Sequence, residues 1–314
     1  MKKNMLKQKK ILVTGGAGFI GAWLVKKLLQ KENKIIVFDN FTTGKLSNLP
    51  VLDKNLLIVK ADIRNLAALK KIFTINKPEI IFHLAALHFI PYCNDHSGET
   101  INVNIAGTQN LLEACKYNLP QKVLLASSAA VYPLGNKPNK EEDKMEAMDI
   151  YGLTKIVNEM QGKQFAKLNK TNLIVARICN VYGPNETNPH VIPSIIQQIM
   201  KRKKTIVLGN IKPKRNYIFV SDVVQAMIMM AEKSAKLYSC YNVGAEKEYS
   251  VKEIVMLLKK ITTQKINIKK DIKLVRKCER MHLKLDISRI KKEIGWVPQY
   301  DIFLGLKETI TSYR

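Results

Sequence analysis

The sequence contains no hydrophobic run that approaches the roughly 20 residues needed to cross a membrane. Its first residues, MKKNMLKQKKILV, place basic side chains before an apolar stretch, as a signal peptide does. That stretch breaks at once at Gly15 and Gly16, so we interpret it as a first strand after a short basic tail. We therefore expect a cytoplasmic protein with no membrane partner.

Cysteine is scarce: the five cysteines are odd in number, scattered and without a CxxC pair. This distribution argues against a disulfide framework and against a metal site, and it fits a reducing compartment. With 15 glycines and 11 prolines among 314 residues, a collagen-like or low-complexity chain is excluded as well.

Acidic residues are also few, since 26 Asp and Glu stand against 52 Lys and Arg and give a formal net charge of +26. Such an excess fits a nucleic-acid or membrane-surface partner, or a lysine-rich composition spread over solvated faces. Basic runs such as 201–204 are not interleaved with the stacking aromatics that an RNA-recognition strand requires. We favour solvated faces, expect no nucleic-acid partner, and retain a preference for anionic small substrates.

Short apolar runs alternate with helix-length amphipathic segments, a pattern typical of βαβ units around a parallel sheet. We expect strands at Lys10–Thr14, Lys34–Phe38, Leu56–Lys60, Ile80–Leu84, Lys122–Ser127 and Leu173–Arg177, and helices at Phe19–Gln30, Asn65–Ile75, Ser97–Tyr117 and Tyr151–Leu168. With right-handed crossovers these elements form an α/β fold with a doubly wound, Rossmann-type parallel sheet.

The pattern becomes irregular after about residue 180, where we expect a smaller C-terminal α/β domain. Its predicted elements are a helix near Ile192–Lys203, a strand at Thr205–Leu208 and a helix at Val251–Ile261. We assign residues 1–179 to a nucleotide-binding domain, to which 216–245 returns, and 180–215 and 246–314 to the substrate domain. The cleft between the two is the natural ligand site.

A glycine-rich turn joins the first expected strand to the first expected helix. Gly15, Gly18 and Gly21 follow a GxxGxxG spacing, which allows a tight turn, close approach of a pyrophosphate and packing of the helix on the sheet. Asp39 ends the second strand about 20 residues later, where a carboxylate accepts ribose hydroxyls and repels a 2′-phosphate. These residues favour NAD over NADP; the alternative is an Asp that merely caps a strand.

Tyr151 and Lys155 stand at i and i+4, on one face of an expected helix. A tyrosine with its ordinary pKa of about 10 is a poor base at neutral pH. A nearby ammonium and a positive nicotinamide ring would favour the phenolate and lower that pKa. Ser127 and Ser128, after the fifth strand, supply a candidate third member. An exposed helical pair is the alternative for the YxxxK spacing.

With these residues the chain resembles the extended short-chain dehydrogenase/reductase family, and within it the NAD-dependent nucleotide-sugar epimerases and dehydratases of the UDP-glucose 4-epimerase type. The likeness runs nearly end to end, through TGGAGFIG, FDNFTTGKLSNL, HLAA, NVNIAGTQNLLEA, SSAAVY, YGLTK, RICNVYGP, RNYIFVSDVVQAM, YNVGAEKEYSVKEI and LDISRIKKEIGWVP. So long a series in one order is specific for the family and much less so for the substrate.

The resemblance implies a role for each matching residue. Tyr151 is the acid and base on the sugar hydroxyl, Lys155 holds the nicotinamide ribose and lowers the pKa of Tyr151, and Ser128 hydrogen-bonds the reacting oxygen, with Ser127 as the competing choice. The positions that match cofactor contacts are Gly15, Gly18, Phe19, Ile20, Gly21, Asp39, Asn40, Gly44, Asp62, Ile63, Leu84, Ala85, Ala86, Asn104, Tyr151 and Lys155.

The resemblance also implies contacts to the nucleotide sugar. Those positions are His88, Ser128, Asn180, His190, Arg215, Arg276 and Glu279. The two arginines match phosphate-gripping positions, where a guanidinium fork suits a diphosphate. A surface ion pair is the alternative for either arginine, and a structural histidine is the alternative for His88.

Two departures from the family pattern bear on the chemistry. Ala129 and Ala130 occupy the places where sugar 4,6-dehydratases of the family carry an acid pair, which argues against dehydration. Leu283 falls near the position where a bulky tyrosine restricts some epimerases to non-acetylated hexoses, so an N-acetylhexosamine or a hexuronate stays open.

The resemblance therefore predicts reversible epimerisation of a nucleotide-diphosphate sugar at C4 through a 4-keto intermediate, in the supply of polysaccharide or glycoconjugate precursors. The nearest alternative is net oxidation or reduction at C4 by the same residues. A non-catalytic NAD-binding regulator is an alternative of another class. The helices at Ser97–Tyr117 and Tyr151–Leu168 match those that form a four-helix dimer interface in the family, so we expect a homodimer.

Overall fold

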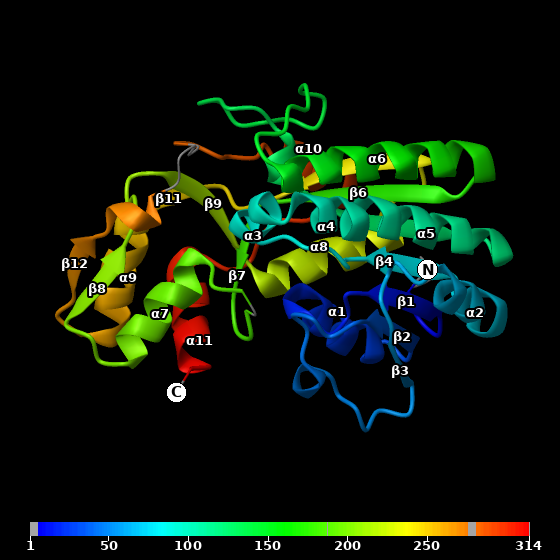
Figure 1. The fold of residues 1–314 in the computed structure, drawn as a ribbon, viewed down its shortest axis with the longest axis horizontal. Coiled ribbons are helices and arrows are strands. Elements are labelled where there is room, and N and C mark those ends of the chain that lie inside the picture. Colours follow the sequence, from blue (N-terminus) through cyan, green and yellow to red (C-terminus); the bar gives the residue numbers. More distant parts are fainter. Residues whose placement is uncertain (1–5, 187, 276–280, 314) are drawn as a thin grey trace.

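The computed structural model describes residues 6–186, 188–275 and 281–313. Its larger part is built on a seven-stranded sheet in the order β10-β6-β5-β4-β1-β2-β3, in which every neighbouring pair is parallel (Figure 1). The strands are β1 (Lys10–Thr14), β2 (Lys34–Asp39), β3 (Leu56–Lys60), β4 (Ile80–His83), β5 (Lys122–Ser128), β6 (Asn172–Ile178) and β10 (Tyr238–Val243). The predicted Rossmann-type fold is confirmed, and the six predicted strands agree to within one residue at either end.

Helices cover both faces of this sheet. The helices on one face are α1 (Phe19–Leu29), α8 (Val220–Lys233) and α10 (Ser288–Ile294), and those on the other are α2 (Leu66–Asn76), α5 (Gly107–Ala114) and α6 (Ile150–Asn169). Ile11 and Val13 of β1 join the first core, and Leu12 between them joins the second. Burial on both faces explains why these strands are nearly continuous apolar runs.

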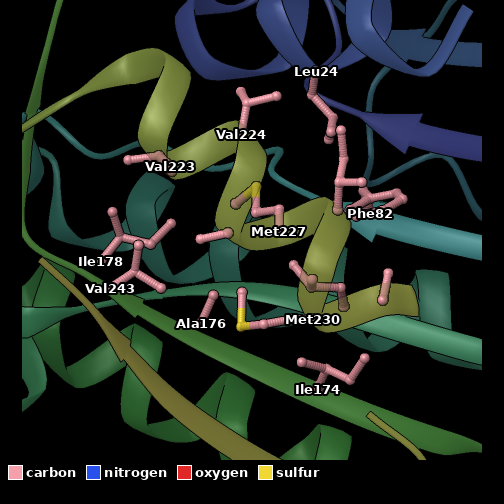
Figure 2. Close-up of a cluster of buried hydrophobic side chains, with 14 of the residues drawn as sticks. Leu24, Phe82, Ile174, Ala176, Ile178, Val223, Val224, Met227, Met230 and Val243 are labelled. Atoms are coloured by element: carbon pink, nitrogen blue, oxygen red, sulfur yellow. The ribbon is translucent and has the colours of Figure 1, made fainter. Parts of the chain in front are cut away.

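Helix α8 brings a methionine-rich face to the first core. Figure 2 shows Met227 and Met230 lying over Ile174 and Ala176 of β6, with Leu24 of α1 on the far side of the helix. Unbranched methionine side chains fill such irregular space between a helix and a twisted sheet.

The segment predicted as one helix at Ser97–Tyr117 is helical over its whole length, but its hydrogen-bond pattern changes along it. It divides into α4 (Ser97–Ile101), a π-helical turn at Asn102–Ala106, α5 and a 3₁₀ turn at Cys115–Tyr117, and it is preceded by α3 (Ile90–Asp95). The wider turn lets the buried Asn104 side chain bond the backbone N–H and carbonyl of Leu87 and the hydroxyl of Thr154. These long-range bonds, and not local propensity, decide the backbone here.

The smaller part of the molecule lies at the left of Figure 1. It contains a three-stranded sheet, β11-β9-β7, and a two-stranded parallel sheet, β8 with β12. Its elements are β7 (Asn180–Tyr182), α7 (Val191–Met200), β8 (Thr205–Leu208), β9 (Lys214–Phe219), β11 (Glu248–Ser250), α9 (Val251–Thr262), β12 (Asn267–Lys270) and α11 (Ile302–Thr311). The helices predicted in this region are found, and Ile195, Ile254 and Leu306 lie in their shared core.

The chain passes between the two parts several times. Residues 220–243 return to the large sheet as α8 and β10, whereas β9 belongs to the small sheet. Leu285, Ile290 and Trp296, from the segment assigned by sequence to the substrate domain, lie in the first core of the large sheet. No helix among the described residues is both long and apolar enough to cross a membrane.

Candidate active site

A cleft with a volume of about 1120 Å³ lies at the carboxyl ends of the large sheet. One wall follows strands β1, β4 and β5, at Gly15, Leu84 and Ser128, and the facing wall includes Arg215 and Leu283. The strand order reverses between β1 and β4, and ligands of doubly wound sheets bind at that point.

The glycine-rich turn shapes the floor of this cleft. Gly15 has φ +70°, and a Cβ there would lie 2.7 Å from the Ala85 backbone nitrogen. A Cβ on Gly21 would collide with the carbonyl of Gly15, and a Cβ on Gly18 would lie 3.3 Å from the same carbonyl oxygen. Helix α1 begins after Gly18 with no side-chain cap and no acidic residue in its first turn. Its unpartnered N–H groups therefore suit a pyrophosphate.

Asp39 lies at the other end of this floor and lines the cleft. Its carboxylate accepts hydrogen bonds from the backbone N–H groups of Ala17, at 2.9 Å, and Phe41, at 2.8 Å. Each oxygen keeps a further lone pair, and the residue lines the cleft beside Asn40. The fixed carboxylate therefore suits ribose hydroxyls and disfavours a 2′-phosphate.

Most predicted cofactor residues line the cleft. They are Gly15, Gly18, Phe19, Ile20, Gly21, Asp39, Asn40, Ile63, Leu84, Ala85, Ala86, Tyr151 and Lys155. Gly44, Asp62 and Asn104 are not among the residues that line the cleft. Gly44 packs on Ala17, where a Cβ would approach the Ala17 backbone to 2.9 Å. The Asn104 side chain hydrogen-bonds the backbone of Leu87, which lines the cleft.

Arg64 is a cleft residue that the sequence reasoning missed. Its guanidinium makes a bidentate contact with Asp62 at 2.8 and 2.9 Å, and Asn40 donates to the same carboxylate at 2.9 Å. Hydrogen bonding by Arg64 holds the pKa of Asp62 well below its ordinary value. The Asp-x-Arg spacing after the third strand is the signal that could have revealed this pair.

The predicted catalytic residues meet in the middle of the cleft. Ser128 ends β5, Tyr151 lies in the first turn of α6, and Lys155 follows one turn later. Ser128 hydrogen-bonds the Tyr151 hydroxyl. Ser127 instead donates to Glu159 at 2.5 Å, so its hydroxyl is already engaged, and Ser128 stays the serine predicted for the reacting oxygen.

The two ionisable groups are perturbed by burial. Burial raises the pKa of Tyr151, and the hydrogen bond with Ser128 lowers it only in part. We predicted that Lys155 lowers the pKa of Tyr151, but among the protein's own groups burial outweighs any such lowering. Burial also lowers the pKa of Lys155 to about 8. The Lys155 ammonium donates to the carbonyl of Ala126 at 2.8 Å and lies 5.7 Å from the Tyr151 ring centre.

The predicted substrate residues Asn180, Arg215, His88 and His190 also line the cleft. Arg215 lies in β9 and donates to the carbonyl of Lys214 at 2.9 Å. Arg276 and Glu279 lie outside the described residues. The sequence reasoning missed Glu186 and Lys273, which line the same cleft from the smaller part.

Comparisons with known proteins decide the family. The model of the NAD dependent epimerase/dehydratase family matches residues 11–244. The chain belongs to this family. It is an NAD-dependent enzyme, and the glycine-rich floor and Asp39 fit that cofactor.

Three solved structures of family members resemble the chain over nearly its whole length. The UDP-glucose 4-epimerase of Thermotoga maritima with UDP-glucose is 31% identical with a TM-score of 0.89, over 97% of this chain and 98% of the other. The UDP-N-acetylglucosamine 4-epimerase of Methanobrevibacter ruminantium, with UDP-N-acetylmuramic acid, is 30% identical with a TM-score of 0.89, over 98% of each chain. The Thermus thermophilus UDP-glucose 4-epimerase with NAD is 25% identical with a TM-score of 0.89, over 97% and 99%. Other family members that resemble the chain are named as decarboxylases and dehydratases.

Proposed function

We propose that this enzyme epimerises a nucleotide-diphosphate sugar at C4, with a UDP-sugar as substrate. The observation that carries the proposal is the set of Ser128, Tyr151 and Lys155 in the cleft, next to Ala129 and Ala130 instead of a second acid and base. The site holds the groups for proton transfer at one hydroxyl, and positions 129 and 130 supply no acid or base for elimination across C5 and C6.

Tyr151 and Ser128 have different roles in the proposed reaction. Tyr151, as phenolate, removes the proton of the 4-hydroxyl, and Ser128 hydrogen-bonds the same oxygen. Bound NAD supplies the hydride acceptor and donor at C4. The positive charge of the nicotinamide ring would lower the pKa of the buried Tyr151 hydroxyl. After the 4-keto sugar has turned about its diphosphate link, Tyr151 would return the proton to the 4-oxygen while Ser128 keeps its hydrogen bond to that oxygen.

The second part of the molecule supplies the contacts for the nucleotide diphosphate. Arg215 and Lys273 are the cations that line this wall among the described residues, and a guanidinium fork suits a diphosphate. Leu283 lines the wall as well, at the position expected to set the room for the sugar's substituents. A leucine there leaves room for an N-acetyl group.

A 4-dehydrogenase or 4-ketoreductase with the same residues is the alternative reaction. It would change the absorbance of NADH in proportion to product, whereas epimerisation leaves the absorbance constant while the sugar is converted. Tyr151→Phe should lower kcat by at least about 100-fold without loss of bound NAD. Wild-type turnover in this variant would rule out the assignment of Tyr151.

We also propose a homodimer through α4 and α6. Ile101, Leu153 and Met160 are 42%, 45% and 62% exposed on these helices, as expected for an apolar face that a partner covers. The double substitution Leu153→Glu/Met160→Glu should yield a folded monomer in sedimentation. An unchanged dimer would contradict this interface.

We place the reaction in the cytoplasm, in the supply of precursors for polysaccharides. In support, Cys93, Cys115, Cys179 and Cys240 are free, buried thiols, which suits a reducing compartment.

A further inference from the structure

A cluster of polar side chains that the mechanism above does not use lies at one region of the cleft, and three of its four members line the cleft. His88 follows β4, and Glu186, Asn188 and His190 come from the loop between β7 and α7. The rings of His88 and His190 meet edge to face, with centres 5.7 Å apart. Glu186 contacts His190 at 3.6 Å and is only 3% exposed.

His88 has no hydrogen-bonding group left for an anion. The Asn188 side-chain N–H donates to His88 Nε2 at 3.0 Å, so this nitrogen is the acceptor of the neutral ring. The other nitrogen is the donor, and it bonds the carbonyl of Ala86. Burial, together with the nearby His190, lowers the pKa of His88 to about 4, so the ring is uncharged at neutral pH.

Glu186 therefore dominates the charge of this cluster. Its carboxylate accepts the backbone N–H of Asn188 at 3.1 Å and faces His190. Glu186 already faces His190 Nδ1, so a second carboxylate that paired with the other ring nitrogen would bring two negative charges to one imidazole. The other described cations of the cleft have different contacts or proposed roles: Arg64 pairs with Asp62, Lys155 bonds Ala126, and Arg215 and Lys273 are the cations proposed for the diphosphate.

We propose that Glu186, packed beside His88 and His190, makes this enzyme select an uncharged sugar and reject a hexuronate. The proposal rests on the proposed C4 epimerisation, because turning the sugar about its diphosphate link exchanges the sides on which its C2 and C6 groups lie. A cluster that lies beside the sugar ring, on either side, faces the C6 group in one of the two poses. A C6 carboxylate would meet Glu186 there, whereas a hydroxymethyl or acetamido group would meet polar partners.

The test is equilibrium binding to the NAD-loaded Tyr151→Phe protein, which holds the sugar without turnover. UDP-glucose, UDP-N-acetylglucosamine and UDP-glucuronate are titrated calorimetrically. We expect UDP-glucuronate to bind at least about tenfold more weakly than the better of the two neutral sugars. Equal or tighter binding of UDP-glucuronate would overturn the proposal, whatever the variants below do.

Glu186→Gln, added to this protein, keeps the shape and the acceptor for Asn188 and removes the charge. It should reduce the discrimination against UDP-glucuronate to about threefold or less. Glu99→Gln is the matched control, since Glu99 lines the cleft elsewhere and accepts the Tyr92 hydroxyl at 2.7 Å. If both variants reduce the discrimination against UDP-glucuronate equally, the discrimination depends on the net charge of the protein, and this result would contradict a role for Glu186. The two proposals can fail separately. If UDP-glucuronate binds more weakly but the wild-type enzyme epimerises no sugar, the proposed function is refuted and the selectivity stands.

Discussion

The indole N–H of Trp23 donates a hydrogen bond to the carbonyl oxygen of Pro184 at 3.2 Å. Trp23 lies in α1, whose N-terminus forms the floor for the cofactor, and Pro184 precedes Glu186 in the loop that lines the sugar region. The Trp23 ring also meets Phe219 edge to face, with centres 6.2 Å apart. The Trp23 side chain thus links helix α1, at the cofactor floor, to the loop that carries Glu186.

Trp23→Phe should weaken sugar binding and spare the cofactor. The variant keeps an aromatic ring and loses the N–H, so the loop is held less firmly and KM for the nucleotide sugar should rise about fivefold with kcat little changed. Trp296→Phe is the control, because Trp296 loses a comparable bond, to the carbonyl of Asp222 at 3.2 Å, in the core behind the sheet. Steady-state kinetics that show the same KM in all three proteins would contradict the connection.

Lys155→Met should remove a pH dependence of stability along with activity. The pKa of Lys155 is about 8 in the folded protein against its ordinary value of 10.5, so between these pH values the unfolded chain binds more protons and folding stability rises with pH. Relative to the variant, the wild type should gain up to about 3 kcal/mol from pH 7 to 10.5. Urea unfolding at a series of pH values measures the difference.

Lys163→Met is the control for that series. Lys163 lies in the same helix and is exposed, so its substitution should leave the pH dependence of the wild type unchanged. A Lys155→Met protein whose stability follows the wild-type pH curve would show that the ammonium is not held in a desolvated site.

Asn104→Ala should destabilise the protein by about 1 to 3 kcal/mol, because it leaves the part-buried backbone N–H and carbonyl of Leu87 without their side-chain partner. It should also weaken NAD binding, since Leu84, Ala85 and Ala86 of the same segment line the cleft. Asn102 is exposed in the same π-helical turn, and Asn102→Ala should cost less than about 0.5 kcal/mol. Equal unfolding midpoints for both variants would refute the role of Asn104.

Glu159→Gln should cost about 3 to 5 kcal/mol, because it breaks a buried ion pair in which Arg177 and Glu159 are 4% and 3% exposed. The same carboxylate accepts the Ser127 hydroxyl next to Ser128. Adding Arg177→Met removes the unpaired guanidinium, so the double variant should be more stable than the single one. Calorimetric unfolding checks the order, and a double variant less stable than Glu159→Gln would contradict it.

The features that were predictable from the sequence depend on local patterns. The central strands were found because both of their faces are buried, and the turn at Gly15 because its backbone excludes a side chain. The pair of Tyr151 and Lys155 followed from helical spacing. NAD as cofactor and the α/β fold agree with the comparisons.

The features that were missed depend on contacts distant in sequence. Asn104 changes the helical hydrogen-bond pattern through bonds to Leu87 and Thr154. Glu186 reaches the cleft only because β7 and α7 bring its loop back beside His88. The pKa of Tyr151 is set by burial, which the spacing of a lysine does not reveal.

The measurement that tests the account most directly is proton NMR of the anomeric region with the enzyme, NAD and a mixture of UDP-glucose, UDP-N-acetylglucosamine and UDP-glucuronate. We predict a new anomeric signal that grows to equilibrium from a neutral sugar while NADH does not accumulate. A keto or carboxylate product formed in step with NADH, or a mixture unchanged by active-site concentrations of enzyme, would contradict C4 epimerisation of a UDP-sugar.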